Sequence, residues 1–337
     1  MSERAQIEND LALFRAEWDD PSPYMTVQTS GSTGTPKQMR VLKERMRASA
    51  RLTCQFLGLK KGDTALLCMP LRYIAGKMVV VRALEWGLKL LVREPSGHPL
   101  AEPFDGDLDF VAMIPLQVYN SLQVPAERER LTRIRHLIIG GGAIDRELEA
   151  ALRPLPNRIY STYGMTETLS HVAMRRLNGP EASEYYEPFP SVQLSLSPDQ
   201  TLVIDAPLVC DGPLVTNDVV DLQPDGHFRV IGRKDNIINS GGVKIQIETV
   251  EAKLRPFLTA PFAITALPDP KFGEAIVLLT TAEATAFPPK ALDRYERPKQ
   301  ILRVEAIPMT GSGKIDRAAC RRLAIETNEC QTSKSKR

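Results

Sequence analysis

The sequence has none of the features that direct a protein into or across a membrane. No apolar run reaches the roughly 18 residues that a membrane-spanning helix requires. The first segment, MSERAQIENDLALF, lacks the basic, apolar and small-residue order of a signal peptide. We therefore expect a cytoplasmic protein that does not bind a membrane.

Cysteine is scarce and badly placed for structural cross-links. The five cysteines are odd in number, widely spread and never in C-x-x-C spacing; they are Cys54, Cys68, Cys210, Cys320 and Cys330. A disulfide framework or a structural zinc site needs closely spaced, usually even sets of cysteines. This argues against both and agrees with a reducing compartment.

The sequence also lacks an excess of either charge. Lys and Arg total 43 against 41 Asp and Glu, so the formal net charge is +2, and the two signs are interleaved. A nucleic-acid-binding domain normally carries a basic stripe, so no nucleic-acid partner is expected. With 43% apolar and 25% charged residues, the composition is ordinary for a globular protein. A length of 337 residues is enough for a large domain and a smaller one.

Short apolar runs alternate with segments of helical period in the first half of the chain. The strand-like runs are LLVR at 90–93, FVAMIP at 110–115 and LIIGGG at 137–142, and residues 39–57 have the apolar spacing of a helix. This alternation predicts an α/β fold, with layered α/β/α packing around a sheet.

After about residue 185 the pattern changes to short strands. Turn sequences at 197–201 (SPDQT) and 223–227 (QPDGH) predict a β-rich subdomain. After GRKDN, a helix pattern (QIETVEAKLRPFL) and a strand (AIVLLTT) predict a small, mobile α+β C-terminal lid. We therefore expect a large domain over 1–234, a lid domain over 235–331 and a frayed tail over 332–337.

The stretch TSGSTGTPK at 29–37 is the strongest indication of a ligand. It follows an apolar run, MTV, and precedes a segment of helical period. Small residues let a backbone close around an anion, hydroxyls donate hydrogen bonds to phosphate oxygens, and a lysine adds a point charge. The residues concerned are Thr29, Ser30, Gly31, Ser32, Thr33, Gly34, Thr35, Pro36 and Lys37. The stretch predicts a phosphate site; a flexible Ser/Gly linker is the alternative.

The spacing of this stretch is not that of a P-loop kinase. The pattern G-x-x-x-x-G-K-[ST] does not occur here. It is also absent at TGSGKI near residue 313, where Pro308 takes the first glycine position. The commonest interpretation of a Gly-rich phosphate loop is therefore disfavoured.

Two further segments place residues that could bind a nucleotide at the ends of predicted strands. LIIGGGAIDREL at 137–148 ends a strand in three glycines, against which a flat ring can lie, although tight turns also use such triplets. IYSTYGMTETLSH at 159–171 offers an aromatic face, a hydroxyl and a carboxylate, which suit adenine, phosphate and magnesium. In isolation, Tyr163 could equally be a core aromatic and Glu167 a helix N-terminal acid.

Taken together, these ordered motifs resemble the adenylate-forming superfamily of acyl-CoA and aryl-CoA synthetases, peptide-synthetase adenylation domains and luciferases. The resemblance implies ATP and Mg²⁺ as cofactors, with TSGSTGTPK as the phosphate loop and Glu167 as the magnesium ligand. It places Thr166 beside Glu167 among the catalytic residues. The implied nucleotide pocket consists of Gly141, Gly142, Ala143, Thr162, Tyr163 and Gly164.

Four later residues match functional positions of that superfamily. Asp218 in VTNDVV corresponds to the aspartate that holds the ribose hydroxyls, and Arg233 in GRKDN to a second ribose contact. Asp235 corresponds to the hinge residue and Lys314 in PMTGSGKIDR to the mobile catalytic lysine. A carboxylate suits a vicinal diol, and an ammonium on a flexible segment can meet negative charge developing at the α-phosphate. The alternatives are a turn aspartate and a solvated surface lysine.

The segment MPLRYIAGKMVVVRAL at 69–84 resembles the acid-pocket motif of bacterial o-succinylbenzoate-CoA ligases, which serve menaquinone synthesis. Their substrate has one activated and one spectator carboxylate, so a second cation is needed near the pocket. Arg82 is our candidate, aided by Lys77; a surface arginine on an amphipathic helix is the alternative. The predicted acid-binding residues are Tyr73, Gly76, Lys77, Arg82 and His171, although His171 could simply be packed.

The resemblance also implies two half-reactions. Carboxylate and ATP give acyl-AMP and pyrophosphate, and the thiol of coenzyme A, the co-substrate, then displaces AMP. The stretch GGVKIQIETVE at 241–251 corresponds to the loop of the thioester step, through Gly241, Gly242 and Lys244. The lid is expected to rotate about Asp235 between the two steps.

A CoA ligase for another aryl or acyl acid is one alternative, and two further functions share the nucleotide motifs. One is a stand-alone adenylation domain that loads a carrier protein. The other is a nucleotide-sensing pseudoenzyme, which the joint presence of Lys314, Glu167, Asp218 and Arg233 disfavours. Only residues 1–27 and Gln28 precede the phosphate loop, fewer than in most members of the superfamily. Because a reduced N-terminal layer leaves apolar surface to cover, we expect a homodimer.

Overall fold

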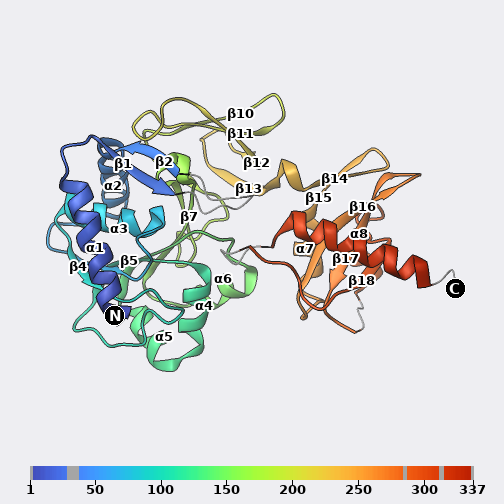
Figure 1. The fold of residues 1–337 in the computed structure, drawn as a ribbon, viewed down its shortest axis with the longest axis horizontal. Helices are drawn as coiled ribbons and strands as arrows, with labels where there is room; N and C mark the ends of the chain where they lie inside the picture. The colour runs from blue at the N-terminus through green and yellow to red at the C-terminus, as the bar shows by residue number, and fades with distance from the viewer. Residues whose placement is uncertain (1–2, 29–37, 284–286, 311–314, 335–337) are drawn as a thin grey trace. The chain divides into compact units, whose positions relative to one another are not determined.

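A computed structural model describes residues 3–28, 38–283, 287–310 and 315–334 of the chain (Figure 1). It divides into two compact units. The N-terminal unit comprises Met1–Ser195, Val203–Leu214 and Leu222–Arg229; the C-terminal unit comprises Leu196–Leu202, Val215–Asp221 and Val230–Arg337. The domain boundary expected at residue 234 stays a prediction, and each unit is described by itself below.

The N-terminal unit is built on a seven-stranded sheet of order β4-β3-β5-β6-β7-β8-β9. The strands are β3 (Thr64–Leu67), β4 (Lys89–Val92), β5 (Leu108–Met113), β6 (Ile134–Ile139), β7 (Arg158–Gly164), β8 (His171–Arg176) and β9 (Glu187–Pro188). Pairing is parallel from β4 to β7 and antiparallel for β8 and β9. The expected α/β class and the strands expected near 90, 110 and 137 are confirmed.

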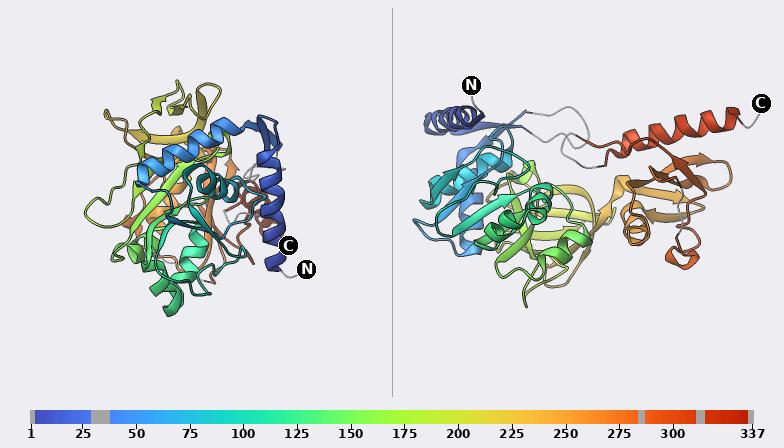
Figure 2. Two further views of the ribbon diagram at one scale, coloured as in Figure 1. Left: turned by 90° about the vertical axis from the view of Figure 1, so that its left-hand side faces the viewer. Right: turned by 90° about the horizontal axis from the view of Figure 1, so that it is seen from below.

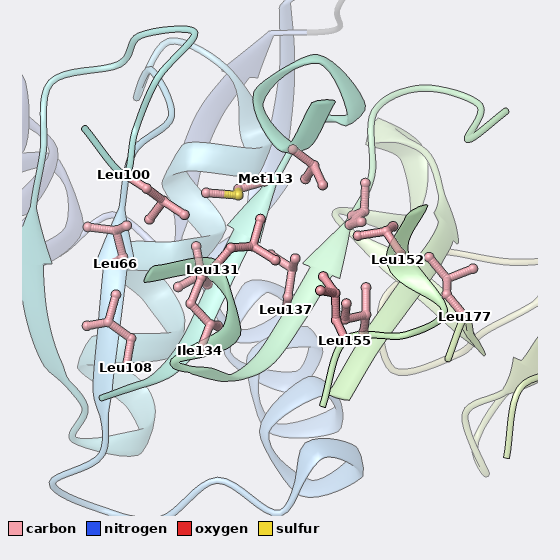
Figure 3. Packing of buried hydrophobic residues seen from close by; sticks show 14 of the residues in the cluster. Leu66, Leu100, Leu108, Met113, Leu131, Ile134, Leu137, Leu152, Leu155 and Leu177 are labelled. Atoms are coloured by element: carbon pink, nitrogen blue, oxygen red, sulfur yellow. The ribbon is translucent and has the colours of Figure 1, made fainter. Parts of the chain in front are cut away.

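Helices cover both faces of this sheet. The helices of the unit are α1 (Glu3–Asp19), α2 (Lys43–Leu57), α3 (Ile74–Trp86), α4 (Pro115–Gln123), α5 (Pro125–Thr132) and α6 (Arg146–Leu152). Because strand side chains alternate between faces, Val111 and Met113 of β5 join the core cluster beneath α4, α5 and α6 (Figure 3). The ring of Phe110 points to the other face, where it lies 5.9 Å from the guanidinium of Arg82 on α3.

The helix expected over 39–57 is wrong at its start. Residues Gln38–Leu42 form strand β2, which pairs antiparallel with β1 (Tyr24–Gln28), and α2 begins only at Lys43. Met25 and Val27 of β1 and Val41 of β2 are buried. In β1 the buried apolar residues alternate with exposed ones, which is the period of a strand. Gln28 pairs with Gln38, so the nine residues of TSGSTGTPK join two paired strand ends rather than a strand and a helix.

A four-stranded sheet of order β10-β11-β12-β13 forms the β-rich region expected after residue 185. Its strands are β10 (Gln193–Leu196), β11 (Thr201–Asp205), β12 (Leu214–Leu222) and β13 (Phe228–Arg233). The turn sequences at 197–201 and 223–227 lie between the strands as expected. Their backbone hydrogen bonds include Gly226 N to Gln223 O at 3.0 Å.

The C-terminal unit packs one helix on each face of a five-stranded sheet (Figure 2). Its elements are β14 (Ile237–Ser240), β15 (Val243–Gln246), α7 (Ile247–Leu254), β16 (Phe262–Asp269), β17 (Gly273–Thr280), β18 (Gln300–Arg303) and α8 (Arg317–Lys334). Along β16, Ile264 and Ala266 join the core beneath α7, whereas Ala263 and Leu267 join the core beneath α8. Helix α8 continues to Lys334, into the tail expected to fray from residue 332.

A buried ion pair ties the two helices of this unit together. Glu251 of α7 is 5% exposed. Both of its carboxylate oxygens accept hydrogen bonds from Arg317 of α8, at 2.5 and 2.7 Å, and one oxygen also accepts the backbone N–H of Ile264 at 2.8 Å. Bidentate pairing that also satisfies the remaining lone pairs is the geometry in which a buried charge pair is tolerated.

The described cysteines lie in the core as free thiols. Cys54, Cys68, Cys210 and Cys320 are free and buried, and burial raises the pKa values of the Cys54 and Cys68 thiols to about 12. Within the described residues, no helix combines the length and apolar character needed to cross a bilayer.

His136 makes the stability of the N-terminal unit depend on pH. It lies on β6, is 2% exposed, and its Nδ1 has no hydrogen-bond partner within the described part of the chain. Burial, followed by the charges of Arg135, Arg158 and Arg176, lowers its pKa from 6.5 to about 4. Between about pH 6.5 and about pH 4, His136 is protonated in the unfolded chain but not in the folded one. The free energy of unfolding therefore decreases as pH falls through this range.

We predict that His136→Gln removes a loss on the order of 3 kcal/mol across this pH range. Urea unfolding of the parent and the variant between pH 8 and pH 4 measures the difference in slope, with the values at pH 8 as the baseline. Equal slopes in the two proteins would show that His136 titrates normally in the folded state.

Candidate active site

The carboxyl ends of three neighbouring parallel strands bring two of the predicted motifs together. Gly140, which follows β6, donates its N–H to the carbonyl of Met113 at the end of β5, at 3.1 Å. The hydroxyl of Thr162 on β7 donates to the carbonyl of Ile139 at 3.2 Å. GGGA and STYGMTE therefore meet at one edge of the sheet, which is where ligands bind in open α/β sheets.

Tyr163 is part of an aromatic cluster at this edge. Its ring centroid lies 4.9 Å from that of Phe228 in an edge-on arrangement and 5.9 Å from that of Tyr186. The Tyr186 hydroxyl lies 2.8 Å from Ser161 Oγ. Tyr163 is only half-buried, so a supported aromatic surface is available beside the glycine segment, as a flat base requires.

Thr166 and Glu167 begin a short 3-10 helix, η1 (Thr166–Thr168), directly after β7. Thr166 is buried, whereas Glu167 is exposed. The Glu167 carbonyl accepts the thiol of Cys210 at 3.5 Å, and its carboxylate has no hydrogen bond or ion pair to any described residue. A free, hard oxygen ligand of this kind fits Mg²⁺, which is typically held by one or two carboxylates together with substrate phosphates.

Arg82 is buried, and the surface arginine considered as its alternative is wrong. Its side chain is 2% exposed on α3, and its Nη2 donates to Ser170 Oγ at 2.7 Å. Its Nε has no partner, and among the described residues no carboxylate pairs with it. Burial lowers the pKa of the Arg82 guanidinium to about 10, so the group stays charged at neutral pH at a cost in desolvation.

His171 lies in the same buried region. Its Nε2 is 3.0 Å from Thr53 Oγ1 of α2, and its Nδ1 is 3.2 Å from Ser170 Oγ. Burial, followed by the charge of Arg82, holds the pKa of His171 well below 6.5. Ser170 and Thr53 were not among the predicted site residues, and no sequence pattern relates residues that lie 118 positions apart, as Thr53 and His171 do.

The other predicted acid-binding residues lie in the first turn of α3. Tyr73 precedes the helix and is 36% exposed, with the Arg72 guanidinium 4.9 Å from its ring centroid. A side chain at Gly76 would collide with the carbonyl of Pro70, so the first turn of α3 packs closely against the segment that follows β3. Lys77 faces α1, with Nζ 3.6 Å from Glu17 Oε2.

The residues matched to ribose binding and to the hinge form one network in the C-terminal unit. Arg233 of β13 donates from Nη1 to Asp218 of β12 at 3.4 Å and from Nη2 to Asp235 at 3.0 Å. Asp235 lies in the 3-10 helix η2 (Lys234–Asn236) and also accepts from Asn217 at 3.0 Å. Arg233 thus contacts both of the other residues taken from the resemblance, although the roles of all three stay predictions.

Gly241 and Gly242 form the two-residue turn between β14 and β15. Ser240 pairs with Val243 across the turn, and the φ angles of the glycines are +60° and +82°. A tight hairpin of this kind needs positive φ at both positions, which glycine adopts without strain. Lys244, which follows on β15, is exposed, so the turn presents a cation beside the exposed backbone of Gly242.

Nine predicted site residues lie outside the described residues. They are Thr29, Ser30, Gly31, Ser32, Thr33, Gly34, Thr35 and Lys37 of the phosphate loop, and Lys314. The flanks of Lys314 are described: Met309 and Ile315 form a β-bridge, and Asp316 donates its N–H to Pro308 O at 2.9 Å.

A surface hollow of about 360 Å³ lies elsewhere, between α1 and α2. Residues 18–23 line one side and residues 42–44 and Arg47 the other. None of the predicted site residues borders it, so the site is defined here by the strand ends and by the residues around Arg82.

Comparisons with known proteins point to one family. The model of the AMP-binding enzyme family matches residues 3–208. A solved structure of an AMP-forming acyl-CoA synthetase/AMP-acid ligase II-like protein from Dyadobacter fermentans DSM 18053 is 35% identical, with a TM-score of 0.65 and 92% of each chain covered.

Two further relatives carry more specific names. The 2-succinylbenzoate–CoA ligase of Listeria monocytogenes is 25% identical over 94% of this chain and 73% of its own length. The o-succinylbenzoate coenzyme A synthetase of Bacillus subtilis, solved with ATP and magnesium ion, is 20% identical with a TM-score of 0.70, covering 87% of this chain and 68% of that one. The latter likeness concerns the fold alone.

We predict that Arg82→Met stabilises the ligand-free protein, because it removes a buried charge that no carboxylate neutralises. The expected gain in the free energy of unfolding is about 1–3 kcal/mol. Urea unfolding without ligands measures it. Arg175→Met is the matched control: Arg175 is held by both carboxylate oxygens of Glu149, at 3.1 and 2.9 Å, so its loss should destabilise. A loss of stability in Arg82→Met as large as that in Arg175→Met would mean that Arg82 is a structural residue.

Proposed function

The chain belongs to the AMP-binding enzyme family and is an AMP-forming acyl-CoA ligase, and we propose that its substrate is a small aromatic acid with a second carboxylate. Within this class we propose o-succinylbenzoate, activated by ATP and transferred to coenzyme A as a step of menaquinone synthesis. The observation that carries the proposal is the buried, uncompensated guanidinium of Arg82.

A buried cation without a counter-ion is a costly arrangement. The desolvation penalty for an ion in a protein interior is several kcal/mol after relaxation, and no described residue supplies a carboxylate to offset it. An acid with a spectator carboxylate would supply that charge on binding. Arginine suits this role because its planar fork can bind a carboxylate in a bidentate manner.

The nucleotide would occupy the strand-end edge. We assign the phosphates to the loop at 29–37, the base to the surface made by Gly141, Gly142 and Tyr163, and the ribose to Asp218 and Arg233. Glu167 would hold Mg²⁺, which would neutralise phosphate charge and orient the departing pyrophosphate. These assignments rest on the order of the motifs and on the contacts within each unit.

The chemistry needs no nucleophile from the protein. A carboxylate oxygen of the acid attacks the α-phosphorus and pyrophosphate leaves; the thiol of coenzyme A then attacks the acyl carbon, loses its proton, and AMP leaves. Lys314 would stabilise the negative charge that builds on the α-phosphate. We assign the second step to Gly241, Gly242 and Lys244 after rotation about Asp235. Homodimerisation remains a prediction.

We predict that o-succinylbenzoate supports pyrophosphate release with a kcat/KM at least about a hundredfold above that of an aromatic acid without the second carboxylate. Parallel assays with benzoate, the monoacid matched in shape and a medium-chain fatty acid, each with ATP and Mg²⁺, give the ratio. Thioester formation with free coenzyme A then identifies the acceptor. Equal rates with the monoacids would contradict the dicarboxylate proposal without affecting the ligase class.

We predict that Lys314→Ala slows adenylation by on the order of a hundredfold or more, which corresponds to a lost transition-state contact of about 3–4 kcal/mol. ATP–pyrophosphate exchange measures this step. Lys253→Ala is the control, because Lys253 pairs with Glu296 on the surface of the same unit. Unchanged exchange in Lys314→Ala would remove Lys314 from the mechanism.

A further inference from the structure

The guanidinium of Arg82 is held through a chain of polar side chains that crosses three elements. Its Nη2 donates to Ser170 Oγ at 2.7 Å. Ser170 in turn lies 3.2 Å from His171 Nδ1, and His171 Nε2 lies 3.0 Å from Thr53 Oγ1. The chain thus joins α3, the start of β8 and α2 within the N-terminal unit.

The hydrogen bonds of this series of side chains all run in one consistent donor-to-acceptor direction. Thr53 Oγ1 donates its proton to the carbonyl of Ser49 at 3.1 Å, so it accepts from His171 and the Nε2 of that ring carries the hydrogen. With His171 neutral, its Nδ1 is an acceptor and accepts a hydrogen bond from the Ser170 hydroxyl. The Ser170 oxygen is then left as an acceptor, which is what Arg82 requires.

The backbone holds Ser170 in place at a cost. Leu169 has φ 63° and ψ −36°, and Ser170 donates its N–H to the carbonyl of Thr168 at 2.7 Å. This is a γ-turn of positive φ, a rare and strained conformation for a residue with a side chain. Strain of this kind persists only where the surroundings determine it fully.

Close packing around Leu169 and Ser170 determines the conformation of this turn. The carbonyl of Ser170 accepts the Thr168 hydroxyl at 2.6 Å. A side chain at Gly164 would collide with the same carbonyl and with the Cα of His171, so the end of β7 packs directly on this turn. Leu169 is 2% exposed, which fixes its side chain in the core. The Ser170 hydroxyl is therefore presented to Arg82 from a rigid base.

We propose that Ser170 is a positioning residue that orients the Arg82 guanidinium towards the second anionic group of the acid, with His171 and Thr53 fixing the direction of its hydroxyl. This inference deepens the proposed function and rests on it. It assigns to residues 168–171 a role in acid selection that is separate from the role of Glu167 towards the nucleotide.

A kinetic comparison of Ser170 variants tests the proposal. Ser170→Ala is expected to raise the KM for o-succinylbenzoate about tenfold while kcat, the KM for ATP and the KM for the matched monoacid change less than about threefold. Ser170→Thr keeps the hydroxyl and is expected to restore the parent KM. Ser121→Ala is the control for loss of a buried hydroxyl, because Ser121 donates to Glu127 away from this chain.

Equal rises in KM for the dicarboxylic acid and the monoacid, or no rescue by Ser170→Thr, would overturn the positioning role. Absence of acid-dependent pyrophosphate release in the parent protein is a different outcome: it would remove the proposed function, and with it any role of Ser170 towards an acid.

A second measurement is independent of activity. Nitrogen NMR of the imidazole rings in the ligand-free protein, assigned with His171→Gln, should show His171 neutral with its hydrogen on Nε2 from pH 8 down to pH 5.5. Thr53→Val should disturb this signal, and Ser121→Ala should not. A hydrogen on Nδ1, or normal titration near pH 6.5, would contradict the directed chain whatever the substrate is.

Discussion

The proposed acid site depends on one unfavourable interaction, the burial of the Arg82 charge without a carboxylate beside it in the described part of the chain. A buried charge without a partner lowers the free energy of unfolding, so we expect it to be retained only where a bound ligand supplies the opposite charge. The surrounding α3 side chains are apolar and buried, among them Met78, Val79, Val80 and Val81, so the helix would pack well with a methionine in that place. We therefore propose that an anionic group of the substrate, rather than a residue of the core, is the partner of the Arg82 charge.

The rest of the N-terminal unit explains how that charge comes to lie near the nucleotide residues. Parallel strands β5, β6 and β7 end at one edge, where the glycine segment and the segment with Tyr163 and Glu167 meet. The chain then turns through Leu169 into β8, which runs antiparallel to β7. Glu167 precedes this short, strained turn and Ser170 follows Leu169 within it, so the two residues lie close together in the sequence. We propose that this one strand end serves both the nucleotide and the acid.

Much of this could be predicted from the sequence, because local patterns determine it. The strands near 90, 110 and 137, the turns at 197–201 and 223–227, and the motifs at strand ends all follow from residue type and period. The start of α2 could not be predicted, since residues 39–42 fit a helical spacing and only their pairing with β1 makes them a strand. The roles of Ser170 and Thr53 were missed for a similar reason: their contacts arise from tertiary packing. The environment of Arg82 also depends on that packing, because the sequence pattern predicts a surface arginine and a buried one equally well.

Calorimetric titration of the acid itself tests the central claim most directly. Two aromatic acids that differ only in whether the second carboxylate is free or converted to its amide would be titrated into the protein with a non-hydrolysable ATP analogue and Mg²⁺. The account predicts that the free dicarboxylate binds at least about tenfold more tightly and that Arg82→Met abolishes this preference. Equal affinity for the two acids in the parent protein would contradict the claim that Arg82 awaits an anionic partner.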